Sequence, residues 1–341
     1  MKKLTPAKLN EFFAAIAATR ALYLPVDNEK GKAEYKAWTE GTEMSRQLNT
    51  LRSAKDFFFP QTENLMEFKM NGKQVEVIDT RREAEDFVIF GVRACDAASF
   101  KILDSVYLVD PVDSYYKTRR EHGTVVTLAC EKPSETCFCK VFGIDAADPA
   151  GDVTVWETEA GYMLRANTEK GESLLEATAA LLEGGDEAAV SAAQERTRAI
   201  VEKLPFSSLS TEGLGVGKTG ELFDRPEWKT LSEACLGCGT CTFVCPTCQC
   251  YDVRDFDSGN GIKRSRCWDS CMYSDFTLMA HGNSRNSQVE RFRQRFMHKL
   301  VYYPDRNNGT FGCVGCGRCL SRCPISMNIV KVMKTMGGKS K

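Results

Sequence analysis

The motif Cys-x2-Cys-x2-Cys-x3-Cys-Pro occurs twice in the last third of the chain and limits its possible folds more than any other feature. The copies contain Cys235, Cys238, Cys241 and Cys245, and Cys313, Cys316, Cys319 and Cys323. Three thiolates at this spacing surround one side of a [4Fe–4S] cluster, while the cysteine before proline ligates the other cluster of a pair. The repeat therefore predicts two clusters with crossed ligands.

The crossed pattern assigns each cysteine of the repeat to one cluster. Cluster 1 is expected to bind Cys235, Cys238, Cys241 and Cys323, and cluster 2 is expected to bind Cys313, Cys316, Cys319 and Cys245. Glycines inside both motifs suit loops that wrap closely around a cluster. Structural zinc is the alternative, but zinc ribbons use cysteine pairs that lie well apart, and the 2-2-3 spacing followed by proline does not match them.

The long separation of the two motifs favours a helical ferredoxin arrangement over the compact βαβ type. Residues 246–312 lie between them, and 285–303 carry one apolar helical face: Val289, Phe292, Phe296, Leu300 and Tyr303. The basic residues of this segment fall elsewhere on the predicted helix: Arg291, Arg293, Arg295 and Lys299. They are interpreted either as a solvated face or as a dock for an acidic partner such as a small ferredoxin.

The first part of the chain is predicted to be an α/β domain with a small, mostly parallel sheet. Residues 1–60 have mainly helical apolar spacing. Apolar runs at 86–92 and 123–130 predict strands on either side of a helix over 97–108, with Asp96 as its N-cap. A hairpin and two helices are expected at 152–167, 170–183 and 186–203.

Composition shifts divide the chain into two predicted domains. Residues 1–204 form the α/β domain, and the Ser- and Gly-rich segment 205–224 forms a linker. Residues 225–341 form an α-helical, ferredoxin-like domain that carries two [4Fe–4S] clusters and has a helical insertion at 251–310.

Four further cysteines predict a third [4Fe–4S] site in the α/β domain: Cys95, Cys130, Cys137 and Cys139. Parallel neighbouring strands end at the same sheet edge, so Cys95 and Cys130 are expected side by side. The Cys137-Phe138-Cys139 loop is close enough in sequence to fold over that edge. Buried free thiols and a zinc site are the alternatives.

Four cysteines remain without an assignment: Cys248, Cys250, Cys267 and Cys271. They are interpreted as unligated thiols near the clusters, with a fourth cluster as the alternative. The segment 213–220 resembles a phosphate-binding loop but lacks its first glycine, and there is no dinucleotide-binding fingerprint. No flavin or nucleotide is therefore expected on this chain.

Composition sets the expected location and partner class. The net charge of −1 gives no reason to expect nucleic acid or an anionic membrane as partner. Sixteen cysteines without a recognisable export signal or a membrane-length apolar run indicate metal binding in a reducing, cytoplasmic compartment.

Several ordered motifs together resemble one iron–sulfur subunit family. They are FFFPQTE (57–63), GVRACDAASFKILDSVYL (91–108), LACEKPSETCFC (128–139), CLGCGTCTFVCPTCQCYD (235–252), WDSCMYSDFTLMAHG (268–282), ERFRQRFMHK (290–299) and CVGCGRCLSRCP (313–324). The family includes the beta subunit of cytoplasmic sulfhydrogenase-type [NiFe] hydrogenases and the first subunit of anaerobic sulfite reductase. Similar subunits accompany flavin-containing NAD(P)H oxidoreductases and electron-bifurcating complexes. Cys267 lies outside the family motifs.

The resemblance implies an electron relay in a hetero-oligomeric complex. The expected partners are a flavin- and NAD(P)H-binding subunit similar to ferredoxin reductase and further redox subunits, with a soluble ferredoxin as a further candidate. The relay interpretation gives the chain no bond-making chemistry of its own. The alternative is a catalytic or flavin-binding subunit whose first domain binds substrate near Cys95.

Overall fold

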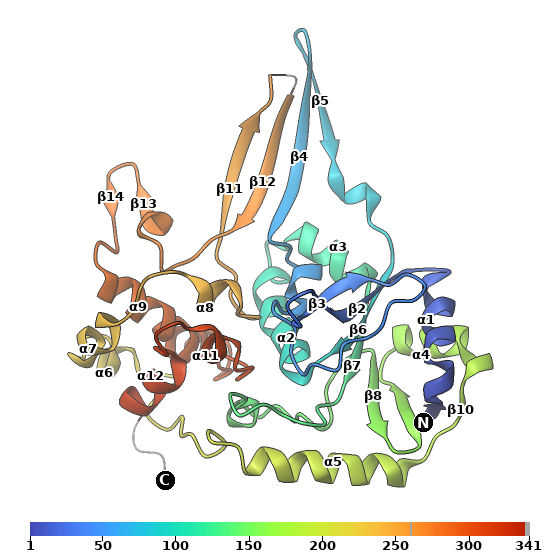
Figure 1. Ribbon diagram of the computed structural model, residues 1–341. Helices are drawn as coiled ribbons and strands as arrows, with labels where there is room; N and C mark the ends of the chain where they lie inside the picture. Colours follow the sequence, from blue (N-terminus) through green and yellow to red (C-terminus); the bar gives the residue numbers. More distant parts are fainter. Residues whose placement is uncertain (260, 338–341) are drawn as a thin grey trace.

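The computed structural model describes residues 1–259 and 261–337 and contains a large mixed sheet, a projecting sheet and a helical C-terminal region (Figure 1). The large sheet has the order β10-β1-β9-β8-β7-β6-β2-β3. Its strands are β1 (Lys2–Leu4), β2 (Ala21–Asp27), β3 (Ala33–Ala37), β6 (Phe87–Val92), β7 (Gly123–Leu128), β8 (Val153–Thr158), β9 (Gly161–Ala166) and β10 (Glu183–Gly184). The four central strands, β2, β6, β7 and β8, are mutually parallel.

Strands β6 and β7 are buried on both faces, which explains their mainly apolar sequences. Val88 and Phe90 of β6 pack on the side of α1 (Leu9–Ala17) and α4 (Glu169–Ala177). Ile89 and Val92 pack on the opposite side against α2 (Ala94–Tyr107). The β6–α2–β7 order confirms the predicted βαβ unit. The hairpin β8–β9 and the helices α4 and α5 (Glu187–Glu202) also form where they were predicted.

Two local predictions for the N-terminal part are wrong. Within residues 1–60 only Leu9–Ala17 forms an α-helix, because Ala21–Asp27 pairs with β6 and continues into the strand β3. The N-cap of α2 is Arg93, whereas Asp96 lies inside the first turn and is 1% exposed. Residues 1–60 have mainly helical apolar spacing, but residues 21–27 form a strand because they pair with β6.

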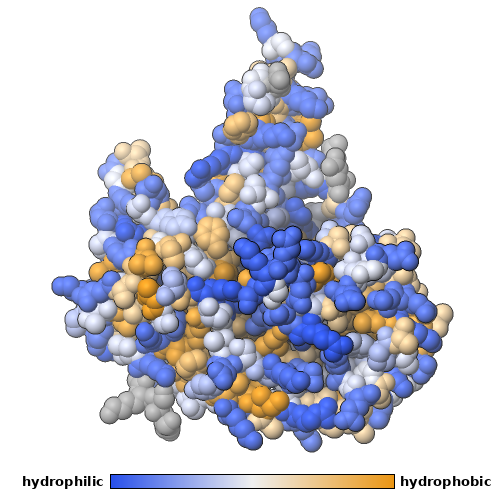
Figure 2. Space-filling model, in the orientation of Figure 1, coloured by the Kyte–Doolittle hydropathy of each residue, from blue (hydrophilic) through white to orange (hydrophobic). Residues whose placement is uncertain are grey.

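The second sheet joins strands from both parts of the chain. It has the order β11-β12-β4-β5 and projects from the body of the molecule (Figure 1). Its strands are β4 (Thr62–Asn71), β5 (Gln74–Asp79), β11 (Tyr251–Asp257) and β12 (Gly261–Trp268). The start of the predicted helical insertion 251–310 is therefore a β-hairpin, and β12 pairs with β4 in antiparallel register. The face of this sheet seen in Figure 2 is mainly hydrophilic, with scattered apolar side chains.

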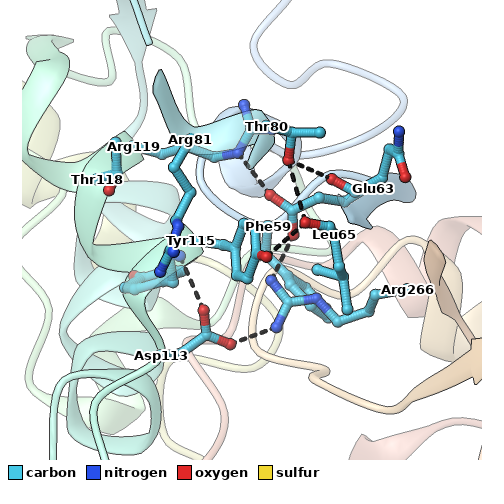
Figure 3. A network of polar contacts seen from close by, with 12 residues as sticks. Phe59, Glu63, Leu65, Thr80, Arg81, Asp113, Tyr115, Thr118, Arg119 and Arg266 are labelled. Carbon is cyan, nitrogen blue, oxygen red and sulfur yellow. Dashed lines mark hydrogen bonds and ion pairs between the residues drawn. The ribbon is translucent and has the colours of Figure 1, made fainter. Parts of the chain in front are cut away.

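Buried ion pairs hold the base of the projecting sheet (Figure 3). Arg266 of β12 is 3% exposed and contacts the carboxylates of Glu63 and Asp113. Arg119 Nε donates to the other carboxylate oxygen of Glu63 at 2.9 Å. Arg119 lies in α3 (Ser114–His122), and Asp113 is the N-cap of this helix. These contacts connect β4 and β12 to the large sheet's helical layer.

The C-terminal region is built mainly from short helices around one apolar core. They are α6 (Thr219–Leu222), α7 (Glu227–Glu233), α8 (Thr240–Phe243), α9 (Gln288–Met297), α10 (Tyr303–Arg306), α11 (Arg318–Arg322) and α12 (Ile329–Met336). A π-helical turn, His298–Tyr302, joins α9 to α10, so the predicted helix over 285–303 is confirmed. A short hairpin, β13 (Leu278–Met279) with β14 (Gly282–Asn283), precedes α9. Leu209 and Leu214, in the expected linker, also pack into this core. Within the described residues, no helix is long and apolar enough to cross a membrane.

Candidate metal centres

The structure brings the predicted ligands of cluster 2 together. Cys313 and Cys316 lie in the loop that enters α11, Cys319 lies in α11 itself, and Cys245 follows α8, which packs against α11. Burial raises the pKa of the thiols of Cys313, Cys316 and Cys319, and a thiolate at Cys245 raises it further, so Cys245 is an electrostatic neighbour of all three. The crossed contribution of Cys245 therefore agrees with the geometry.

Two of the four predicted ligands of cluster 1, Cys235 and Cys241, are electrostatic neighbours. Cys238 is the cysteine whose side chain is exposed. The thiol of Cys323 approaches the carbonyl oxygen of Met327 at 3.2 Å. Within the described residues, no hydrogen bond joins Cys323 to the other three thiols.

Glycines allow the cysteine loops to pack against other segments. Gly315 and Gly317 have φ of 60° and 76°, in the left-handed region that glycine adopts without strain. A Cβ on Gly315 would lie 2.5 Å from the backbone of Phe138, and one on Gly317 would lie 2.5 Å from the carbonyl oxygen of Thr136. The Phe138 N–H donates to the Gly315 carbonyl at 2.9 Å. The Cys137–Cys139 loop thus lies directly on the second cysteine motif.

The four cysteines of the α/β domain lie in one buried region. Cys95 is in the first turn of α2, and Cys130 lies two residues beyond the end of the adjacent parallel strand β7. Cys139 is an electrostatic neighbour of Cys95, Cys130 and Cys137. Each of the four is 7–8% exposed. The sheet-edge argument thus located these side chains correctly.

This region also contains a cysteine of the second motif. Cys316 packs in the same apolar cluster as Cys95, Cys130 and Cys139. Arg318, two residues later, forms a buried ion pair with Asp96 of α2, with Nη2 and Oδ2 2.8 Å apart. Sequence reasoning missed this pair, because 222 residues separate its members.

The buried environment of the α/β-domain thiols favours the binding of a positively charged group. Burial raises the pKa of Cys137 and Cys139 to about 12, so without a compensating charge both remain protonated at neutral pH. Backbone N–H groups hydrogen-bond several of these sulfurs, including Ala94 N–H to Cys130. Iron would stabilise the thiolates, and the N–H donors would stabilise their negative charge.

Two of the four basic side chains of α9 and the following turn fit neither interpretation of that helix, whereas Arg291 and Arg293 are partly exposed. Arg295 and Lys299 are 3% and 5% exposed, so they form neither a solvated face nor a docking surface. Arg295 Nη1 lies 3.3 Å from the Cys248 sulfur, and Lys299 Nζ donates to Thr247 Oγ1 at 2.7 Å. Both cations thus point into the cysteine-rich region.

The donors fit iron–sulfur clusters by their chemistry. They are thiols from the paired motifs, held in glycine loops and accompanied by buried cations. Among residues 1–259 and 261–337, no three His, Cys, Asp or Glu side chains are arranged to hold a single metal ion. A [4Fe–4S] cluster distributes its four thiolates over four irons, so its ligands lie farther apart than those of one ion.

Comparisons with known proteins define the class and then the family. The model of the 4Fe–4S dicluster domain matches residues 234–327, which makes the C-terminal region a ferredoxin-like 4Fe–4S domain. The chain is 35% identical over 286 residues to sulfhydrogenase 2 subunit beta of Pyrococcus furiosus, covering 83% of this chain and 82% of that protein. The chain therefore belongs to the family of iron–sulfur beta subunits that includes this sulfhydrogenase subunit. No solved structure matches it.

Proposed function

We propose that this chain relays single electrons between a flavin-containing partner subunit and another redox centre of a multi-subunit oxidoreductase. Family membership and the dicluster domain support an electron-transfer role. The observation that carries the relay itself is the position of Cys316, which belongs to the second motif but packs against Cys95, Cys130 and Cys139. The α/β domain is then part of the electron path.

Three groups of residues are assigned to hold [4Fe–4S] clusters. The sets are Cys235, Cys238, Cys241 and Cys323; Cys313, Cys316, Cys319 and Cys245; and Cys95, Cys130, Cys137 and Cys139. When bound, such clusters accept and release one electron at a time. The chain's own groups fix the positions of the thiolates, exclude water from the second and third sites, and supply N–H donors and cations that favour the reduced state.

The three sites form a continuous series. The third site meets the second at Cys316, and Cys241 of the first set is an electrostatic neighbour of Cys245 of the second. Cys238 is the member of the first set whose side chain is exposed. This order supports electron entry or exit at the Cys238 end and at the α/β domain.

The proposed complex is cytoplasmic and hetero-oligomeric. The sulfhydrogenase relative is by name one subunit of a larger enzyme. We propose as partner a flavin- and NAD(P)H-binding subunit similar to ferredoxin reductase, with further redox subunits or a soluble ferredoxin as the other electron carrier. Flavin absorbance or substrate turnover by the purified chain alone would instead support the catalytic alternative near Cys95.

Removing two ligands tests the third site. Iron and acid-labile sulfide are measured per chain after anaerobic reconstitution, together with EPR spectra of the reduced protein. Replacing Cys137→Ser and Cys139→Ser should remove about four irons and one set of EPR signals, because these thiolates provide half of the site. Cys267→Ser is the matched control and should keep all its iron. Full iron in the double variant would show that the α/β domain holds no cluster.

A further inference from the structure

Three of the four unassigned cysteines lie together in the structure. Cys248 and Cys250 follow the first motif, and Cys271 follows β12. The thiols of Cys250 and Cys271 are hydrogen-bonded to each other, and Cys248 is an electrostatic neighbour of Cys250. Asp269 N–H donates to the Cys250 carbonyl at 2.9 Å, which holds the two segments together.

The fourth unassigned cysteine is placed differently. Cys267 lies within β12, where its backbone is paired with Asp252 on one side and Thr62 on the other. Its thiol is an electrostatic neighbour of Arg254, on the exposed strand β11. The group of unassigned thiols that lie together therefore has three members, of which Cys248 also contacts Cys245 of the second set. Cys267 provides a natural control.

Two deeply buried cations adjoin this group. Lys55 is 1% exposed, donates to the Cys248 carbonyl at 2.9 Å and lies 3.5 Å from the ring centre of Trp268. Arg295 is 3% exposed and donates to the Cys241 carbonyl at 2.6 Å, with Nη1 3.3 Å from the Cys248 sulfur. Its Nε atom is buried and has no hydrogen-bond partner among the described residues.

The partners of these cations do not balance their charge. In the described part of the chain, Lys55 and Arg295 form no ion pair with a carboxylate. Their partners are carbonyl, hydroxyl and thiol groups and aromatic rings. Buried charges are costly unless they are paired. The site thus combines three clustered thiols with unbalanced positive charge.

We propose that Cys248, Cys250 and Cys271 bind an additional iron–sulfur cluster through three thiolates, with Lys55 and Arg295 balancing its negative charge. Three thiolates suit a [3Fe–4S] cluster, or a [4Fe–4S] cluster whose fourth iron has a ligand other than cysteine. The inference adds one site to the proposed electron relay, but its test does not depend on the site at Cys137 and Cys139.

Serine substitutions in the full chain test the proposal. After anaerobic reconstitution with iron and sulfide, Cys271→Ser and Cys250→Ser should each lose three to four irons and one EPR signal compared with wild type. Cys267→Ser should lose none, and the Cys137→Ser, Cys139→Ser protein should retain the signal that Cys271→Ser loses. An EPR signal lost from the oxidised protein indicates [3Fe–4S], and one lost from the reduced protein indicates [4Fe–4S].

A charge variant provides a readout that does not require ligand removal. Lys55→Met should retain the iron and shift the reduction potential of the Cys271-dependent signal to a more negative value, because a nearby positive charge favours the reduced cluster. Lys229→Met, on the surface of α7, is the charge-matched control. The proposal would be overturned if the protein with Cys248→Ser, Cys250→Ser and Cys271→Ser had the same iron content as wild type. It would also be overturned if this site bound zinc in place of iron.

Discussion

At the scale of single residues, the pair between Arg318 and Asp96 has a large expected effect on stability. Both side chains are at most 3% exposed, and Arg318 Nε also donates to the Thr50 carbonyl at 2.9 Å. Arg318→Met would leave the Asp96 carboxylate buried without its partner. We expect a loss of about 3–5 kcal/mol in the free energy of unfolding, measured by anaerobic denaturant titration.

Two comparisons control this prediction. Adding Asp96→Leu to Arg318→Met should restore much of the loss, since no charge then remains buried. Arg254→Met breaks an ion pair whose arginine side chain is 75% exposed, and it should change stability by less than about 1 kcal/mol. Equal losses in Arg318→Met and Arg254→Met would contradict the importance of the buried pair.

His298 should make stability depend on pH. Burial, followed by the positive charges of Lys299 and Arg306, lowers its pKa from 6.5 to about 4. Below pH 6.5 the unfolded chain takes up a proton that the folded chain refuses until about pH 4, so stability falls as the pH falls across this window. The shift corresponds to about 2 kcal/mol lost between pH 7 and pH 5.

Thermal unfolding at several pH values checks this effect. His298→Gln should flatten the decline between pH 7 and pH 5 relative to wild type. His122→Gln is the histidine control, because His122 lies near the surface, where its ring contacts Asp86. The same pH slope in wild type and His298→Gln would show that this imidazole does not contribute.

At the scale of helices and strands, local sequence patterns predicted the elements whose neighbours are close in the chain. The run at 87–92 is apolar throughout and the run at 123–128 is mainly apolar, because both faces of the central sheet are covered, and their strand assignment was correct. Residues 21–27 and 251–268 gave no comparable signal. Their strands depend on pairing with β6 and β4, which local spacing does not encode.

The same distinction applies to the candidate sites. Ligand spacing inside each cysteine motif was visible in the sequence, and the strand ends at Cys95 and Cys130 placed those thiols at one edge. The contacts of Cys316 with the α/β domain, and the burial of Arg295, were not predictable. The helical spacing correctly placed Arg295 outside the apolar face of α9. It could not show that cysteine loops cover the opposite face of the helix, where Arg295 contacts Cys248.

At the scale of the whole molecule, the two predicted domains are joined by more than the expected linker. Strand β12 from the C-terminal part pairs with β4 in the projecting sheet (Figure 1). Arg318 contacts Asp96, and Phe138 contacts Gly315. Each contact crosses the predicted boundary between residues 204 and 225, so the parts contribute to one another's folded structure.

Cleavage within the expected linker should therefore leave the two parts associated. A protease site inserted after Glu212, which is exposed, would cut the folded chain without removing any of these contacts. We expect residues 1–212 and the C-terminal fragment to elute together in gel filtration and to unfold in one transition. Arg266→Ala should weaken the association, because it leaves Glu63 buried without one of its cationic partners, at a cost of about 3–5 kcal/mol. Separation of the cleaved wild-type fragments under native conditions, each retaining its iron, would show instead that the parts fold independently.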